Sequence, residues 1–406
     1  MPAMKNPLVT YPSFRYFFLS RIASAVASQM MMVILAWQMY DLTNSAWDLG
    51  LVGLAQFLPS LVLILVAGQV ADRLDRRLVM AWCLSGQMMI AAILVTGTMQ
   101  GWLSRDAILL ASVALGIAKA FQMPTQQALA PQLVPATVLP RALATVSSGT
   151  QAAVIVGPAL GGFVYVAGAQ AVYMLSGVLF AAAIAAMLCI RVQEPPRARE
   201  PVTLQTLFAG FDYIWRRKDI LGAISLDLFA VLLGGAVALL PIYAKDILHV
   251  GPWGLGLLRG APAAGALLMS IYLAQRPIMR NAGKVMFGSV ALYGVATLVF
   301  ALSTSFLLSL AALALSGMFD MVSVVIRQSL VQLDTPNEMR GRVSAVNSVF
   351  IGASNQLGEF ESGVTASWFG AVPSVLIGGV GTLAIVAAWI RLFPSLARRD
   401  RLVSPS

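Results

Sequence analysis

Ionisable side chains interrupt the long apolar stretches of this sequence, and they are the residues whose chemistry stands out. A charge inside a hydrocarbon layer costs a few kcal/mol, so each must face protein or water. A carboxylate in such a place can take up a proton on one side of a membrane and release it on the other, because its surroundings control its protonation. A cation can pair with that acid or with an anionic group of a substrate. The candidates are Arg21, Lys119, Asp227, Asp320, Glu359 and Glu361.

Among the acids, we expect Asp227 or Asp320 to carry a coupling proton. Lys119 would pair with Asp320 or with the substrate, although a permanent structural ion pair between these two residues is an equal alternative. Arg21 is more simply explained by a side chain that extends to the membrane surface. Glu359 and Glu361 are two residues apart and point to different helix faces, so at most one can face a central cavity directly, and we favour Glu359.

The elements that must position these residues are membrane-spanning helices. Of 406 residues, 59% are hydrophobic and 11% charged, with a mean hydropathy of +0.81. Apolar runs near the 20 residues needed to cross a bilayer indicate helices, because a backbone in lipid must satisfy its own hydrogen bonds. A β-barrel would need short alternating segments, which are absent. The predicted spans are 14–39, 49–71, 78–98, 107–129, 138–166, 169–190, 220–243, 254–275, 285–302, 306–328, 342–367 and 371–393. The first is too long for a cleavable signal peptide.

The basic residues predict the orientation of these spans. With the N-terminus in the cytoplasm, only Arg105 and Lys245 of the 27 Lys and Arg fall in outer loops. That asymmetry follows the positive-inside rule. We therefore expect both termini in the cytoplasm of a bacterial inner membrane, and we assign the net charge of +10 to topology and membrane lipid rather than to nucleic acid.

The chain divides into two related halves. We predict a six-helix bundle over 1–191, a cytoplasmic linker with an amphipathic helix over 192–218, and a second bundle over 219–406. An offset of 201 residues aligns the halves without a gap, including Pro135 with Pro336 and Arg141 with Arg342. Parallel six-helix repeats are typical of transporters in which two bundles rock about a shared site.

Two segments of the first half resemble signatures of the major facilitator superfamily. The loop after the second span resembles its inner-loop motif, at Gly68, Asp72, Arg73, Arg76 and Arg77, with Asp75 in place of a glycine. Its charges could bond to helix ends across the two bundles and act as a gate, or they could serve only as topology markers. Span 5 resembles the motif of proton-coupled antiporters, at Gly157, Pro158, Gly161 and Gly162. Tight helix packing alone would also account for these small residues.

Similarity to one branch of the superfamily covers almost the whole chain. The segments DLTNS at 41–45, AFQMP at 120–124, LPIYA at 240–244 and GEFESG at 358–363 resemble the enterobactin-exporter branch. The resemblance implies export driven by a proton gradient. It also implies a central cavity lined by helices 1, 4, 7 and 10, each of which carries one charge, at Arg21, Lys119, Asp227 and Asp320.

We therefore predict an all-α integral membrane protein of twelve transmembrane helices in two pseudo-symmetric six-helix bundles, the major facilitator fold. No phosphate-binding loop or hydrolase motif is present, so we expect a monomeric transporter rather than an enzyme, with no cofactor or metal. The expected function is proton-coupled export of a small amphiphilic molecule, siderophore-like or drug-like, by alternating access. A lipid or lysolipid flippase is the alternative. A non-transporting sensor or assembly partner fits less well, because the loops are short.

Overall fold

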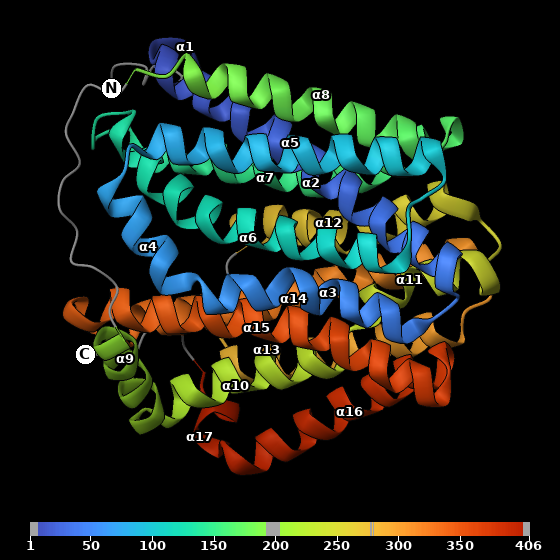
Figure 1. Cartoon of the computed structure of the whole chain (residues 1–406). Helices are drawn as coiled ribbons and strands as arrows, with labels where there is room; N and C mark the ends of the chain where they lie inside the picture. Colours follow the sequence, from blue (N-terminus) through green and yellow to red (C-terminus); the bar gives the residue numbers. More distant parts are fainter. Residues whose placement is uncertain (1–6, 192–203, 277, 279, 401–406) are drawn as a thin grey trace. The chain divides into compact units, whose positions relative to one another are not determined.

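The computed structural model describes residues 7–191, 204–276, 278 and 280–400, with side chains undescribed at Val9, Ile64, Leu65, Asp72, 204–208, Asn337, Glu338, Ala345 and Ser348. The described part of the chain is helical and contains no strand (Figure 1). Within it, ten helical segments are long and apolar enough to cross a membrane. They are Pro12–Thr43, Arg76–Gln100, Arg105–Gln132, Leu139–Ala167, Ala169–Leu188, Lys218–Ile247, Gly251–Gln275, Ala282–Leu302, Phe306–Leu333 and Ala371–Leu392. The prediction of an all-α integral membrane protein is confirmed.

The remaining two predicted spans are helical but differ from the other ten. The second is divided into α3 (Ala46–Val62) and α4 (Ile64–Arg73), with the break at Leu63. Pro59 removes one helix hydrogen bond shortly before that break. The eleventh is α15 (Asn337–Phe369), which is long enough but carries more polar residues than its neighbours. With these two, the structure is consistent with the expected twelve membrane helices.

The chain forms two compact units. Unit 1 comprises residues 1–44, 55–202 and 255–260, and unit 2 comprises residues 45–54, 203–254 and 261–406. Each unit therefore includes a short segment whose chain neighbours belong to the other. The start of α3 belongs to unit 2, and Leu255–Gly260 of α12 (Gly251–Gln275) belongs to unit 1.

In unit 1, five membrane helices pack together. The helix α2 packs against α7 and α8, and α5 packs against α8 and α6 (Figure 1). Large apolar side chains such as Trp82 (77% exposed) lie on the outside, as expected for a surface that faces lipid. Besides α4 and the later part of α3, the elements of this unit are α1 (Pro7–Thr10), α2 (Pro12–Thr43), α5 (Arg76–Gln100), α6 (Arg105–Leu129), η1 (Ala130–Gln132), α7 (Leu139–Val164), η2 (Tyr165–Ala167) and α8 (Ala169–Leu188).

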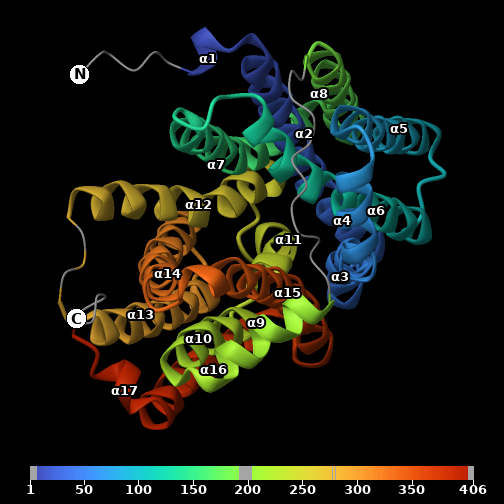
Figure 2. The same cartoon turned by 90° about the vertical axis from the view of Figure 1, so that its left-hand side faces the viewer.

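In unit 2, α13 packs against α14 and α16, and α10 packs against α15 and α16. Figure 2 shows α9 beside α10 and α15, the helices against which it packs. The elements are α9 (Leu204–Arg216), α10 (Lys218–Leu233), η3 (Ala236–Leu239), α11 (Leu240–Ile242), η4 (Tyr243–Ile247), α13 (Ala282–Leu302), α14 (Phe306–Leu333), α15, α16 (Ala371–Leu392) and α17 (Pro394–Ala397).

The helix that carries Asp227 is interrupted. The helix α10 ends at Gly234, and the chain continues through the short turns η3, α11 and η4. The interruption leaves backbone groups that need partners. The hydroxyl of Tyr293 donates to the carbonyl of Gly234 at 3.1 Å. A Cβ at Gly235 would lie 2.4 Å from the carbonyl oxygen of Gly358, so only glycine permits this contact between the interruption after α10 and α15.

Two corresponding turns in the units are made by glycine with positive φ. Gly168, with φ of 95°, precedes α8, and Gly370, with φ of 90°, precedes α16. A residue with a Cβ would be strained at either position. Such tight turns allow consecutive membrane helices to be joined by short loops.

Candidate functional site

The polar centre of unit 2 is a buried ion pair between α10 and α14. The guanidinium of Arg327 donates to the carboxylate of Asp227, and their side chains are 2% and 6% exposed. Arg327 Nε has no hydrogen-bond partner within the described residues. Each charge is removed from water and compensated mainly by the other, so the pair fixes α10 against α14.

Asp320 lies close to this pair on α14. It is half-buried and within electrostatic reach of Asp227, Arg327 and Tyr293. The described residues provide it with no direct hydrogen bond or ion pair. Unit 2 therefore places a compensated acid and a second, uncompensated acid around one arginine.

Unit 1 carries a related set of polar contacts. Arg21 on α2 donates to the side-chain oxygen of Gln126 on α6. Two earlier residues of α6 also form polar contacts. Gln122, one turn before Gln126, accepts a hydrogen bond from Gln87 at 2.7 Å. Lys119, two turns before Gln126, has its Nζ 3.0 Å from Gln56 Oε1.

The pattern follows the internal repeat. At the offset of 201 residues, Gln126 corresponds to Arg327 and Lys119 corresponds to Asp320. In each unit a polar bond joins the first membrane helix to the fourth, by Arg21–Gln126 in unit 1 and by Asp227–Arg327 in unit 2. Seven residues before the bonded residue of the fourth helix lies an ionisable residue, Lys119 or Asp320. Of the four charges expected to line a central cavity, Arg21 and Lys119 lie in unit 1, and Asp227 and Asp320 lie in unit 2.

Lys119 faces a small pocket within unit 1. Ser28, Met31, Met32, Leu35, Gln56 and Leu115 form the rest of its lining. The ammonium of Lys119, the amide of Gln56 and the hydroxyl of Ser28 are the polar groups of this lining, and the space among them is only about 10 Å³.

The two glutamates of α15 have different surroundings. Glu361 accepts a hydrogen bond from the hydroxyl of Thr365, one turn later, at 2.7 Å. Glu359 lies against the start of α3 within unit 2, where a Cβ on Gly53 would be 3.0 Å from its Oε2. The carboxylate of Glu361 is therefore partnered locally, whereas Glu359 lies at a helix contact.

The arginines of the inner-loop motif bond to helix ends. Arg76 is 8% exposed and donates to the carbonyls of Ala71 at 3.0 Å and Ala128 at 3.2 Å. Arg77 donates to the carbonyl of Ile190 at 2.9 Å. Cations stabilise the negative ends of helix dipoles. These bonds join the start of α5 to α4, to α6 and to the segment after α8 within unit 1.

Asp75, which replaces the usual glycine of the motif, is the N-cap of α5. Its carboxylate accepts from the Arg77 amide at 2.9 Å and forms a salt bridge with the Arg77 side chain at 2.7 Å. The hydrogen bond from the Arg77 side chain lowers the pKa of Asp75. The substitution therefore begins a helix. Other residues of the motif lie on α4. Gly68 is within this helix, where a Cβ would meet no atom within 4 Å, and Arg73 is its last residue. The side chain of Asp72 lies outside the described residues.

The glycines of the antiporter-like motif bring α7 close to α2. A Cβ at Gly157 would be 2.6 Å from Gln29 Cβ, and one at Gly161 would be 3.1 Å from Met30 Cα. Gly162 is buried and Pro158 is an internal helix proline. The carbonyl of Pro158 lies 2.3 Å from a Cβ built on Gly256, so the unit 1 segment of α12 packs on the same helix.

Arg327 is not among the site residues predicted from the sequence. It lies near the end of an apolar span, where a cation is also expected at the inner membrane surface. A signal was present, because Arg327 follows Asp320 by seven residues, which places both on one face of a helix.

The family model of the Major Facilitator Superfamily matches residues 17–359. The chain belongs to this superfamily. It is 27% identical to an enterobactin exporter of Citrobacter koseri over 98% of this chain and 95% of that one. It is 26% identical to an enterobactin exporter of Escherichia coli O1:K1 over 93% and 87% of the two chains.

Solved structures share the fold. A bacterial homologue of the human lysosomal transporter Spinster, in an inward-facing and unoccupied conformation, matches with a TM-score of 0.74 and 13% identity over 100% of both chains. A bacterial homologue of the iron transporter ferroportin, inward-facing, matches with a TM-score of 0.71 and 17% identity over 95% of this chain and 99% of that one. The chain is a multi-pass membrane transporter with the predicted major facilitator fold.

Proposed function

We propose that this transporter exports a small amphiphilic molecule of the siderophore or drug-like class from the bacterial cytoplasm, coupled to inward proton movement. The observation that carries the proposal is Asp320, a half-buried acid with no direct partner in the described part of the chain, beside the Asp227–Arg327 pair. Similarity to enterobactin exporters over nearly the full length supports export and the substrate class.

Asp320 suits the coupling role better than Asp227. Protonation of Asp227 would leave Arg327 buried without its counter-ion, which is strongly unfavourable. Protonation of Asp320 leaves the ion pair intact and removes only a neighbouring negative charge. In this mechanism Asp320 takes up a proton from the outer side and releases it to the cytoplasm, while the pair holds α10 and α14 together throughout the cycle.

Lys119 is the proposed substrate contact in unit 1. Its ammonium lies among apolar side chains of α2 and α6, and a siderophore or drug-like amphiphile offers both polar oxygens and apolar surface. Arg21, held by Gln126, is assigned to helix positioning. Glu359 is a second acid at a helix contact that changes its surroundings during alternating access, and Glu361 supports its own helix.

Topology and gating form the rest of the proposed mechanism. The bundles of residues 1–191 and 219–406 rock as bodies joined by the linker 192–218, and the protein acts as a monomer with both termini in the cytoplasm. The motif Asp72, Arg73, Arg76 and Arg77 controls the cytoplasmic side. Gly157, Pro158, Gly161 and Gly162 keep α7 close enough to α2 for that movement to be transmitted.

The test uses purified protein in proteoliposomes, with the cytoplasmic face outward and an acidic interior. Enterobactin, the substrate named for the relatives, and a panel of amphiphilic drugs are assayed for uptake. Accumulation that requires the gradient and is abolished by a protonophore supports the proposal. Movement of a labelled lysolipid without uptake of any panel compound would instead favour a flippase.

A further inference from the structure

A second polar site lies in unit 2, where α9, α10, α14 and the segment after α17 meet. These elements enclose a pocket of about 620 Å³. Its charged lining consists of the cations Arg216, Arg217, Lys218 and Arg399 and the acids Asp219 and Asp334. The proposed transport mechanism uses none of these residues.

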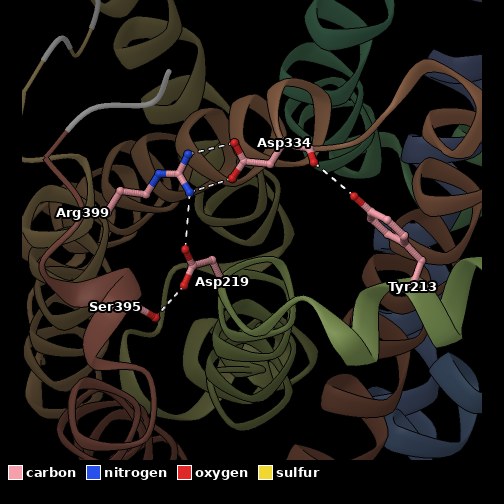
Figure 3. A network of polar contacts seen from close by, with 5 residues as sticks. All are labelled: Tyr213, Asp219, Asp334, Ser395 and Arg399. Atoms are coloured by element: carbon pink, nitrogen blue, oxygen red, sulfur yellow. Dashed lines mark hydrogen bonds and ion pairs between the residues drawn. The ribbon is translucent and has the colours of Figure 1, made fainter. Parts of the chain in front are cut away.

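Both acids of this pocket bond to one cation, Arg399. Arg399 holds both carboxylate oxygens of Asp334, at 2.6 and 2.8 Å, and approaches Asp219 at 3.4 Å (Figure 3). Ser395 donates to the other oxygen of Asp219 at 2.6 Å. Arg399 thus bridges the two carboxylates, and the pocket lining still holds four cations against two acids.

The three cations that join α9 to α10 are exposed. Arg216 bonds to Asp212, one turn earlier, in a pair that is exposed on both sides. Arg217 lies over the ring of Tyr213, at 5.9 Å from its centroid, and neither Arg217 nor Lys218 forms an ion pair within the described residues. This edge of the pocket therefore has an excess of positive charge.

The backbone adds to this positive charge. Arg217 is the N-cap of α10 and makes no side-chain capping bond, while the acid of the first turn, Asp219, bonds to Ser395 and Arg399. Lys218, Asp219 and Ile220 of that turn line the pocket. Free amides and the positive end of a helix dipole favour an anion such as a phosphate.

The surroundings point to a membrane phosphate. The pocket lies at the ends of two membrane helices, since α10 begins at Lys218 and α14 ends at Leu333. Phe211 and Trp215 on α9 are 43% and 63% exposed, with ring centroids 5.9 Å apart. Exposed aromatic rings beside cations at a helix end are typical of the headgroup level of a bilayer.

A buried apolar contact fixes α9 in this position. Ile214 is 1% exposed and packs in a cluster with Ile220, Val331 and Val343. Gly210 adds a close approach, because a Cβ there would be 2.8 Å from the carbonyl oxygen of Arg342. The cations are thus presented by a docked helix, and the pocket is preformed.

We propose that this pocket binds the phosphodiester headgroup of an anionic membrane phospholipid. Arg217, Lys218 and the first amides of α10 hold the phosphate, and the Phe211–Trp215 surface lies against the acyl chains. In the proposed topology this site faces the inner leaflet.

The experiment measures binding to the purified full-length protein in a neutral detergent by native mass spectrometry. The probes are dihexanoyl phosphatidylglycerol, dihexanoyl phosphatidylcholine, which has the same phosphodiester but no net charge, and glycerol 1-phosphate, which has no acyl chains. We expect phosphatidylglycerol to bind at least about tenfold more tightly than either, since charge-assisted bonds and apolar contact are both needed.

The double variant Arg217→Gln with Lys218→Gln should weaken phosphatidylglycerol binding about tenfold or more. The matched control, Arg280→Gln with Lys284→Gln, removes two exposed cations elsewhere in unit 2 and should stay within about twofold of the wild type. The single variant Lys218→Gln, with an intermediate loss, covers the case in which the double variant does not fold.

Equal weakening by both double variants would overturn the proposal in favour of general surface charge. Glycerol 1-phosphate binding as tightly as phosphatidylglycerol would overturn the lipid assignment. The measurement involves no transport, so its failure leaves the proposed export function standing, and the failure of export leaves this site standing.

Discussion

Neutralising both members of the Asp227–Arg327 pair should cost clearly less than the sum of the two single neutralisations. The two side chains are 6% and 2% exposed, so either single variant leaves a buried charge without its partner. Removing one partner of a buried pair costs about 3–5 kcal/mol. We expect a loss of this size in the free energy of unfolding for Asp227→Asn and for Arg327→Gln.

The double variant should lose less stability than the two single losses added together. With both charges gone, neither uncompensated ion remains, and coupling energies of contacting residues reach roughly 0.5–3 kcal/mol. The assay is unfolding of the purified protein in mixed micelles by titration with a denaturing detergent, followed by tryptophan fluorescence. Strict additivity of the two single losses, within about 0.5 kcal/mol, would refute the reasoning, because residues that do not interact add in this way.

Two further variants test packing and charge. A Cβ at Gly317 would lie 1.9 Å from the carbonyl oxygen of Pro262, so Gly317→Ala should lower the free energy of unfolding by about 1–3 kcal/mol. At the control position Gly288 a Cβ would meet no atom within 4 Å, so Gly288→Ala should not lower it. Equal effects of the two substitutions on the free energy of unfolding would contradict the close helix approach at Gly317. Bonding to Arg77 lowers the pKa of Asp75, so the carboxylate stabilises the fold above the ordinary aspartate range and loses that effect as the pH falls through the lowered pKa. Asp75→Asn keeps a capping side chain, so its thermal midpoint should fall below that of the wild type at neutral pH and match it in acid; a difference independent of pH would show that the charge is not responsible.

Much of the fold could be predicted because its physical determinants are local. Apolar length predicts each span, and ten of the predicted spans coincide with helices that are long and apolar enough to cross a membrane. The division of the second span at Leu63 could not be predicted as readily, because an internal proline such as Pro59 bends some helices and ends others. The start of α3 belongs to unit 2 because Gly50 packs closely on α15. This contact could not be predicted, because the two segments are far apart in the sequence.

The candidate site could be predicted only in part. Asp227 and Asp320 stand out because an acid is costly within an apolar run and is rarely found there without a partner or a role in transport. Arg327 could not be recognised as a site residue in this way, because a cation near the end of a span is equally expected at the membrane surface. Which acid is paired depends on the packing of α10 on α14, and hydrophobic periodicity does not encode it.

Proton-driven uptake by the Asp320→Asn variant tests the central claim most directly. Proteoliposomes with an acidic interior should accumulate substrate with the wild type and with the control Asp106→Asn, whose carboxylate is 79% exposed. We predict that Asp320→Asn loses this accumulation yet still exchanges substrate between equal pools, since binding and alternation remain while proton release is lost. Accumulation by Asp320→Asn equal to that of the wild type would contradict the proposed coupling role.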